Sequence, residues 1–310
     1  MKSAIRGLKA VIILAAAAVL PGCQKELCYD HSHMVDLRVD FDWTLAPDAE
    51  PRTMVVRLFR PDGSHYAVYE LTSTVSEHIR VEAGEYIVLC HNGEMENVVE
   101  GGNTYSEYNL STKTKSLLSP MGRTDYPAPP RPGSSRAEPI RNTPDRIYTA
   151  CCTSLRLIPK TDGQSITLQP VEATAHYTVT VTDIENLNPA TEISGALTGM
   201  SEQWNLSTAR PAGASVTHPV AFTHIDEHTI RAEFYVFGHC HDTDTPHYFS
   251  VYTSDNVYKD YDITGQIHDA EDPRHVYIDI SGLVLPRPGT GMTPGVSGWG
   301  EVVNTDINMH

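Results

Sequence analysis

The chain has 310 residues, a formal net charge of −16 and a hydrophobic content of 40%. The hydrophobic content is enough to form buried cores and argues against an intrinsically disordered chain. The acidic balance, with no basic run along the sequence, argues against a protein that binds nucleic acid through its phosphates. The length suits two domains of ordinary size or one large domain.

The first residues have the pattern of a secretory signal peptide. A basic segment that contains Lys2 and Lys9 precedes an apolar stretch at residues 10–20. This stretch is too short to cross a bilayer as a finished helix. We therefore assign residues 1–22 to a signal peptide and exclude them from reasoning about the fold.

The segment Leu-Pro-Gly-Cys at residues 20–23 resembles a bacterial lipobox, in which cleavage leaves a lipid-bearing cysteine first. We expect Cys23 to be that cysteine, and ordinary signal-peptidase cleavage nearby is the alternative. Several acyl chains would hold the protein firmly at a membrane, because each buried methylene contributes about 0.8 kcal/mol. The sequence therefore predicts a lipoprotein that its lipid holds at a membrane.

Strict alternation of apolar and polar residues predicts a half-buried β-strand at residues 35–43, directly after the anchor segment. The same pattern recurs four more times, with turn residues such as Pro61-Asp62-Gly63 between the strands. The further strands are expected at residues 53–60, 66–71, 78–81 and 84–90. Short strands without helical periodicity are typical of a β-sandwich, which we assign to residues 23–118.

Residues 119–146 interrupt this pattern with a composition rich in Pro, Gly, Ser and Arg. Such a segment is expected to be an inter-domain linker or a long exposed loop. Its arginines would also suit cleavage by a trypsin-like protease.

Alternation resumes after this segment and predicts a second β-sandwich over residues 147–310. Its strands are expected at residues 147–152, 154–159, 165–170, 176–182, 231–237, 247–253, 257–263 and 275–280. Residues 195–206 are expected to form a helical turn. The final segment, residues 299–310, either adds an edge strand or donates itself to another subunit, and its candidate partner-strand residues are Trp299, Val302, Val303 and Ile307.

Two groups of histidines have the spacing of metal ligands on an extended chain. His31 and His33 form the first pair, and a site there lacks a third and fourth ligand. The better candidates are His239, His241 and His247. The alternative is chance, because the chain has 15 histidines. We predict neither a bound metal nor a cofactor.

The sequence contains none of the common enzyme motifs. It lacks the nucleophile-elbow, zinc-protease, phosphate-loop and dinucleotide-binding patterns. Pairs of carboxylates such as Asp242 and Asp244 are expected to be solvated. We therefore predict that the protein is not an enzyme.

Several stretches in order resemble a known family. They include CYDHSHMVDLRVDFDW, IRVEAGEYIVLCHN, ITLQPVEATAHYTVTVTDIEN and GWGEVVNTDI. This order resembles the FimB-like fimbrial anchor and accessory lipoproteins of Bacteroidetes, in the fimbrillin superfamily, and within them a sub-group of Bacteroidales lipoproteins. The resemblance implies an all-β fold with two transthyretin-like β-sandwich domains in tandem. It also implies an outer-membrane lipid anchor, expected at the cell surface with the periplasmic face as the alternative, and pilin-like partner subunits that assemble by strand donation.

Two functions follow as hypotheses. The first is a non-enzymatic anchor or accessory subunit of a fimbria-like fibre, held together by main-chain hydrogen bonds along an open strand edge. The alternative is a surface lipoprotein that binds glycan or a host protein, which requires exposed aromatic residues and directs attention to the tyrosines of residues 247–261. A hydrolase or metal enzyme is a third hypothesis, and it has the least support.

Overall fold

The computed structural model describes residues 33–124, 129–189, 191–239, 245–287 and 299–301. The regular secondary structure of the described residues is almost entirely β-strand. They are β1 (Met34–Phe41), β2 (Met54–Phe59), β3 (His65–Leu71), β4 (Ser76–Glu82), β5 (Gly84–Asn92), β6 (Val98–Gly101), β7 (Asn109–Thr112), β8 (Tyr148–Leu157), β9 (Gln164–Leu168), β10 (Val171–Glu172), β11 (Ala175–Thr182), β12 (Ile193–Asn205), β13 (Arg210–Ala221), β14 (Thr223–Asp226), β15 (Thr229–Val236), β16 (Tyr248–Thr253), β17 (Val257–Asp262), β18 (His275–Ser281) and β19 (Gly300–Glu301). A short helix, α2 (Thr264–His268), and three 3₁₀ turns, Trp43–Leu45, Ser119–Met121 and Gly133–Ala137, complete the list.

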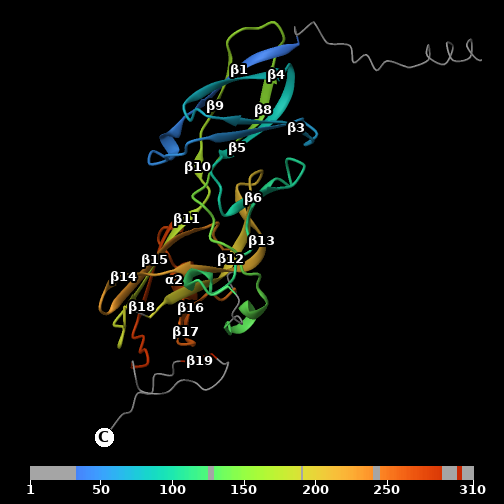
Figure 1. The fold of residues 1–310 in the computed structure, drawn as a ribbon. Helices are drawn as coiled ribbons and strands as arrows, with labels where there is room; N and C mark the ends of the chain where they lie inside the picture. The colour runs from blue at the N-terminus through green and yellow to red at the C-terminus, as the bar shows by residue number, and fades with distance from the viewer. Residues whose placement is uncertain (1–32, 125–128, 190, 240–244, 288–298, 302–310) are drawn as a thin grey trace, which may run out of the picture.

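The strands form two lobes that lie end to end (Figure 1). The first lobe packs the sheet β4-β1-β9 against the sheet β10-β8-β5-β2-β3. The second lobe packs β14-β15-β11-β18 against β19-β17-β16-β12-β7-β6, with β13 paired to β12. The predicted fold class, two transthyretin-like β-sandwiches in tandem, is confirmed.

The two sandwiches repeat one topology of seven strands. In the first lobe, the opening strand β1 pairs antiparallel with β4 and parallel with the closing strand β9. In the second lobe, β11 pairs antiparallel with β15 and parallel with β18. The opposite sheets also correspond, because β3-β2-β5-β8 in one lobe matches β13-β12-β16-β17 in the other. The chain has therefore built the same sandwich twice.

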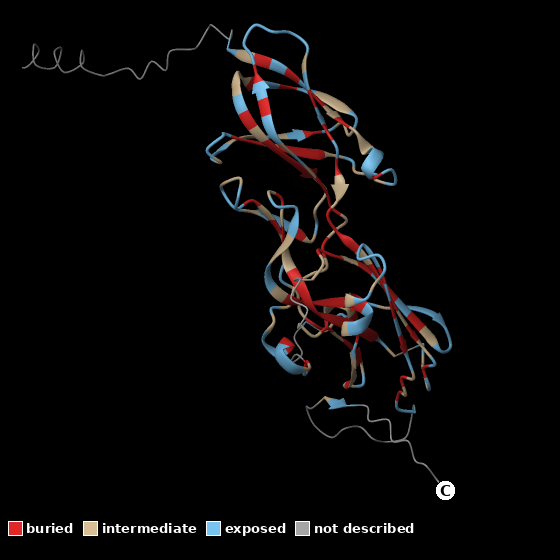
Figure 2. Cartoon of the chain, turned by 180° about the vertical axis from the view of Figure 1, so that it is seen from behind, coloured by how far each residue is buried: buried red, intermediate tan, exposed pale blue. Residues whose placement is uncertain are grey.

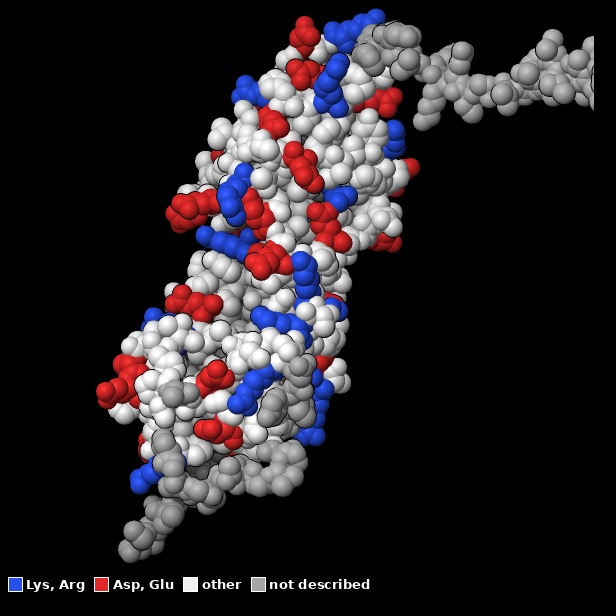
Figure 3. Space-filling model, in the orientation of Figure 1, with Lys and Arg blue, Asp and Glu red and all other residues white. Residues whose placement is uncertain are grey.

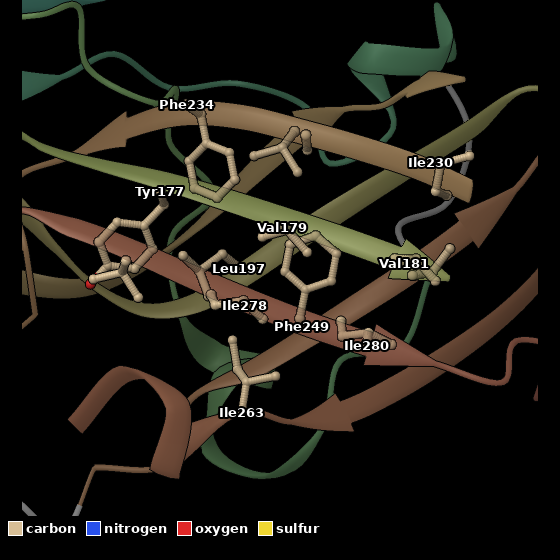
Figure 4. Packing of buried hydrophobic residues seen from close by; sticks show 14 of the residues in the cluster. Tyr177, Val179, Val181, Leu197, Ile230, Phe234, Phe249, Ile263, Ile278 and Ile280 are labelled. Carbon is tan, nitrogen blue, oxygen red and sulfur yellow. The ribbon is translucent and has the colours of Figure 1, made fainter. Parts of the chain in front are cut away.

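Side chains along these strands alternate between buried and solvent-facing positions, as the alternation of apolar and polar residues in the sequence predicts. On β1 the buried side chains alternate with exposed or half-buried ones, and β18 shows the same alternation. The inward residues of the second lobe meet in one apolar core, where Tyr177, Phe249 and Ile278 point toward one another (Figure 4). Buried strands run through both lobes and through the join between them (Figure 2).

The helical turn expected at residues 195–206 is wrong, since this stretch lies inside β12. Nine consecutive residues of β12 are buried, so apolar and polar residues do not alternate along it and the sequence pattern does not distinguish a strand from a helix. Two glycines in this stretch are required by the close packing and the bulge of the strand. A Cβ on Gly195 would lie 2.5 Å from the Phe249 ring, and Gly199 has a φ of +80° beside a register shift between Leu197 and Met200.

The strand pairing also departs from the expected division into residues 23–118 and 147–310. The strands β8 and β9 belong to the first sandwich, because β8 pairs with β5 and β9 pairs with β1. Conversely, β6 and β7 extend a sheet of the second sandwich, where β7 pairs with β12. Alternation indicates which face of a strand is buried and carries no information about which strand is its neighbour.

The segment expected to be a linker or exposed loop is packed against the second lobe in its described parts. Arg131 is buried, and its guanidinium donates to Thr217 Oγ1 at 2.8 Å and to the Glu138 carbonyl at 2.9 Å. Ile140 forms a parallel bridge with Thr217 of β13. These hydrogen bonds satisfy a buried cation and so fix the segment to the sheet.

The two lobes are joined by a third apolar cluster at the waist. It is formed by Phe59 and Leu89 of the first lobe, Trp204 and Phe237 of the second, and Tyr108 between β6 and β7, together with Val98, Leu110, Ile147, Ala173 and Leu206. Tyr108 also links to polar residues of the first lobe, because its Oη accepts from Arg57 Nε at 2.7 Å and lies 2.9 Å from His91 Nε2. Because His91 is fully buried, its pKa is lowered.

A second buried imidazole makes the fold sensitive to acid. His218 of β13 is completely buried and its Nδ1 lies 3.0 Å from the Arg141 carbonyl. Burial lowers the pKa of His218 to about 4. Between this value and the ordinary pKa of 6.5 for histidine, the unfolded chain binds a proton that the folded chain excludes, so stability falls as the pH falls.

We predict that the free energy of unfolding decreases by up to about 3 kcal/mol on account of His218 alone between pH 6.5 and 4. The variant His218→Gln, which keeps a donor for the Arg141 carbonyl, should lose less stability over that range. Urea unfolding at several pH values measures the difference. The matched control is His224→Gln on the exposed strand β14, which should keep the wild-type pH dependence. An unchanged pH dependence in His218→Gln would contradict the assignment.

Candidate functional site

The C-terminal strand lies at the edge of the largest sheet. Gly300 and Glu301 pair in parallel with Val257 and Tyr258 of β17, and Gly300 N–H donates to the Asn256 carbonyl at 2.9 Å. Both residues of β19 are exposed. The described part of the final segment therefore adds a short strand to an edge that would otherwise present unpaired backbone groups.

Trp299 anchors this strand to the sheet. Its ring meets the buried ring of Tyr252 edge-on, with 5.6 Å between the centroids. The pair covers an apolar cluster that contains Leu117, Leu118, Met121 and Ala196. Of the expected partner-strand residues, Trp299 lies on the sheet, whereas Val302, Val303 and Ile307 lie outside the described residues.

The pKa values of two polar side chains of β17, Asp260 and Tyr258, are raised, in part by Glu301 of the added strand. Ser250 Oγ donates to Asp260 Oδ1 at 2.5 Å across the β16–β17 pair. Burial, with a smaller contribution from the nearby Glu301 carboxylate, raises the pKa of Asp260. Burial likewise raises the pKa of Tyr258, again with a smaller contribution from Glu301.

Three histidines converge in the second lobe, beside the middle of β12 and at the end of the β16–β17 hairpin away from β19. His239 follows β15, His247 directly precedes β16, and His268 is the last residue of α2. Their ring centroids are 5.0–5.1 Å apart in all three pairs. The sequence pointed to His239 and His247 and missed His268, which no local motif connects to them. His241, the third expected ligand, lies outside the described residues, as does Asp242.

His247 is held in one orientation. Its side chain is completely buried, and its Nδ1 lies 3.2 Å from the Thr198 carbonyl. Burial lowers the pKa of His247 to about 4, so the imidazole is neutral at pH 7. Nδ1 therefore carries the proton that it donates to the carbonyl, and Nε2 presents a lone pair toward His268.

Three further expectations concern other residues. Cys23 and His31 lie outside the described residues, and His33 is exposed just before β1. The tyrosines of residues 247–261 do not form the expected exposed platform, because Tyr252 is buried and Tyr248, Tyr258 and Tyr261 are half-buried. Their strands pair on both sides, so the side chains pack against neighbours.

A shallow polar cleft of about 290 Å³ lies in the first lobe. Tyr148, Arg146, Arg52, Glu50 and Glu94 are among its lining residues. Arg146 is held by Glu172 through two hydrogen bonds of 3.0 and 2.9 Å, which fixes its guanidinium over the Tyr148 ring.

Acidic and basic side chains are interspersed on the face of the molecule that Figure 3 shows. Within the described ranges, no helix has the length and apolar character needed to cross a membrane.

Comparison with known proteins gives a family and a fold. The family model described as a domain of unknown function (DUF5119) matches residues 22–221. No match was found among curated proteins.

Three solved structures have similar folds. A candidate adhesin from Bacteroides ovatus ATCC 8483 has a TM-score of 0.60 at 15% identity and covers 83% of this chain and 94% of that chain. A candidate polysaccharide-binding protein from Bacteroides thetaiotaomicron VPI-5482 has a TM-score of 0.54 at 8% identity, covering 80% and 91% of the two chains. The fimbrial anchor protein Mfa2 from Porphyromonas gingivalis has a TM-score of 0.51 at 15% identity, covering 81% and 90%. At these identities the likeness establishes the fold.

We predict that Trp299→Ala loosens β19 without unfolding the second lobe. The ring pair with Tyr252 is worth about 0.5–1.5 kcal/mol beyond area burial, so amide exchange at Gly300 should accelerate by roughly two- to tenfold. Hydrogen–deuterium exchange with mass spectrometry measures this. Tyr277→Ala, which removes an aromatic ring from the exposed face of β18, is the control and should leave exchange at residue 300 unchanged. Equal exchange in Trp299→Ala and the wild type would show that the ring pair does not hold the strand.

Proposed function

The chain belongs to the DUF5119 family, and from this premise we propose that it is a non-enzymatic outer-membrane lipoprotein that serves as an anchor or accessory subunit of a fimbria-like fibre. Its fold is shared with a protein described as a fimbrial anchor and with candidate adhesins. The lipid would be carried by Cys23, and the partners would be pilin-like subunits.

The placement of the two ends of the described chain carries this proposal. The first strand, β1, begins at one pole of the elongated molecule, and β19 lies at the opposite pole (Figure 1). Cys23 precedes Met34 by few enough residues that a fully extended segment spans at most about 35–40 Å. A lipid on Cys23 would therefore hold the first pole near a membrane and direct the C-terminal strand away from it.

The sheet edge at β17 offers backbone hydrogen-bonding groups through which a partner strand could bind. Backbone N–H and C=O groups at a sheet edge bind any extended chain of suitable register, and side-chain pockets add selectivity. Here the described edge is short, with two residues of β19 on six residues of β17. We propose that residues 299–310 take part in strand exchange with a partner subunit, with Trp299, Val302, Val303 and Ile307 as the packing residues.

The experiment that tests this proposal is a photo-crosslink in native cells. A photoreactive amino acid at position 303 should capture a subunit with the same β-sandwich fold, identified by mass spectrometry. The control carries the same group at Val75, which is exposed in the first lobe. Capture of transport or glycan-utilisation components from position 303, or equal capture from both positions, would overturn the fimbrial assignment. Unchanged fibres in a strain that lacks the gene would do the same.

The lipid anchor has its own test. We predict that Cys23→Ser abolishes incorporation of a palmitate analogue and moves the protein from the membrane fraction to the soluble exported fraction. Cys151→Ser, which changes an exposed cysteine in β8, is the control and should keep both the label and the membrane location. Retention of Cys23→Ser in the membrane fraction would contradict lipidation at this residue.

The polar cleft of the first lobe favours a second candidate function, binding of a glycan. Arg146, fixed over the buried Tyr148 ring, lies beside Arg52, Glu50 and Glu94, and these charged groups offer hydrogen bonds to sugar hydroxyls. A protein of similar fold is described as a candidate polysaccharide-binding protein. Absence of binding on a glycan array counts against this function.

A further inference from the structure

The three histidines beside the middle of β12 form a group that has no part in the proposed strand exchange. His239, His247 and His268 come from three separate segments and each offers one nitrogen atom. These nitrogen atoms all lie within 4.8 Å of one another. His247 is buried, and His239 and His268 are partly exposed, so the group opens toward solvent on one side.

Two of the nitrogen atoms already face each other at close range. His247 Nε2 lies 3.1 Å from His268 Nε2. A tetrahedral zinc ion with Zn–N distances of about 2.0–2.1 Å places its nitrogen ligands about 3.4 Å apart. The separation of the His247 and His268 nitrogen atoms is close to that value. The third imidazole, His239, has its ring centroid 5.1 Å from both of the others.

The surrounding structure holds His247 as metal-binding histidines are usually held. Its second nitrogen, Nδ1, donates to the Thr198 carbonyl, which fixes the tautomer with the lone pair on Nε2. Its backbone N–H donates to Thr264 Oγ1 at 2.9 Å, and its carbonyl accepts from Ile263 N–H at 3.0 Å. These bonds tie the histidine to the start of α2, the helix that carries His268.

A glycine makes room for the ring. A Cβ at Gly199 would lie 2.4 Å from His247 Nδ1, and the φ of +80° at this residue is one that a side chain would strain. Met200, the next residue, bridges to His239. The bulged part of β12 is therefore shaped around two of the three imidazoles.

The donor set selects the kind of ion. Imidazole nitrogen suits zinc, copper, nickel and iron, whereas magnesium and calcium require oxygen ligands. Three protein ligands leave at least one coordination position for water or for a group from elsewhere.

We propose that His239, His247 and His268 bind one divalent transition-metal ion, Zn²⁺ in preference to Mg²⁺ or Ca²⁺. The ion ties together the chain after β15, the start of β16 and the end of α2. Metal binding would therefore stabilise the second sandwich at the end of the β16–β17 hairpin that lies away from β19.

The test uses the full chain, purified with an affinity tag that contains no histidine and treated with a chelator. Titration calorimetry with Zn²⁺ should show saturable binding of one ion, and the melting temperature should rise with the concentration of Zn²⁺. Mg²⁺ and Ca²⁺ at the same concentrations should leave the melting temperature unchanged. Co²⁺ should produce the intense visible absorption of a four-coordinate nitrogen site.

Two variants locate the site. His239→Gln and His268→Gln each remove one partly exposed ligand and leave buried His247 in place, and each should weaken Zn²⁺ binding by about 100-fold or more. His224→Gln on the exposed strand β14 is the matched control and should bind as the wild type does. Circular dichroism of the metal-free variants separates loss of binding from loss of folding.

Failure to bind Zn²⁺, Cu²⁺ or Ni²⁺ saturably would overturn the proposal. Binding that is unchanged in both His239→Gln and His268→Gln would also overturn it, since the ion would then be held by other histidines. The proposal is independent of the fimbrial function, so the photo-crosslink at position 303 and the zinc titration succeed or fail separately.

Discussion

The parallel pairing of the first strand of each sandwich with its last strand is the constraint on which the rest of the molecule depends. The pair β1–β9 closes the first sandwich only at residue 168, long after the chain has left it. Between β5 and β8 the chain adds β6 and β7 to the second lobe and then returns. The second lobe therefore contains two strands, β6 and β7, that precede the last strands of the first lobe in the sequence. The apolar cluster around Tyr108 and Trp204 fills the join between the lobes. Two sandwiches interleaved in this way are stiffer than two joined by a linker.

The sequence was a good guide to strands and a poor guide to their neighbours. Strands such as β1 and β18 have one buried face, so their alternation predicted them correctly. The stretch in β12 was misread because both of its faces are buried and glycines fill the close contacts. The division of the chain near residue 146 was misplaced for a different reason. Pairing between β5 and β8 depends on contacts far apart in sequence, and alternation does not encode them.

The same distinction applies to the candidate sites. Trp299 was predictable because a large aromatic residue in an expected edge strand gains most by packing on the sheet. His239 and His247 stand out in a histidine-rich stretch, whereas His268 reaches them only because the β16–β17 hairpin and α2 fold back beside the bulged middle of β12. The tyrosines of this hairpin were expected at the surface, yet strands that are paired and stacked bury or half-bury their rings.

On the proposed function, the topology also determines how the protein would bear load. Tension from a lipid on Cys23 enters at β1, which is the central strand of its sheet. It is paired with β4 along seven residue positions and with β9 along five. Pulling along β1 shears two rows of hydrogen bonds together, whereas an edge strand pulled the same way would be held by one row. The load then crosses the waist cluster to β12 and leaves through β16 and β17 to the C-terminal strand. The histidine group joins the start of β16 to the helix that follows β17, so a bound ion would brace the hairpin on which the C-terminal strand lies.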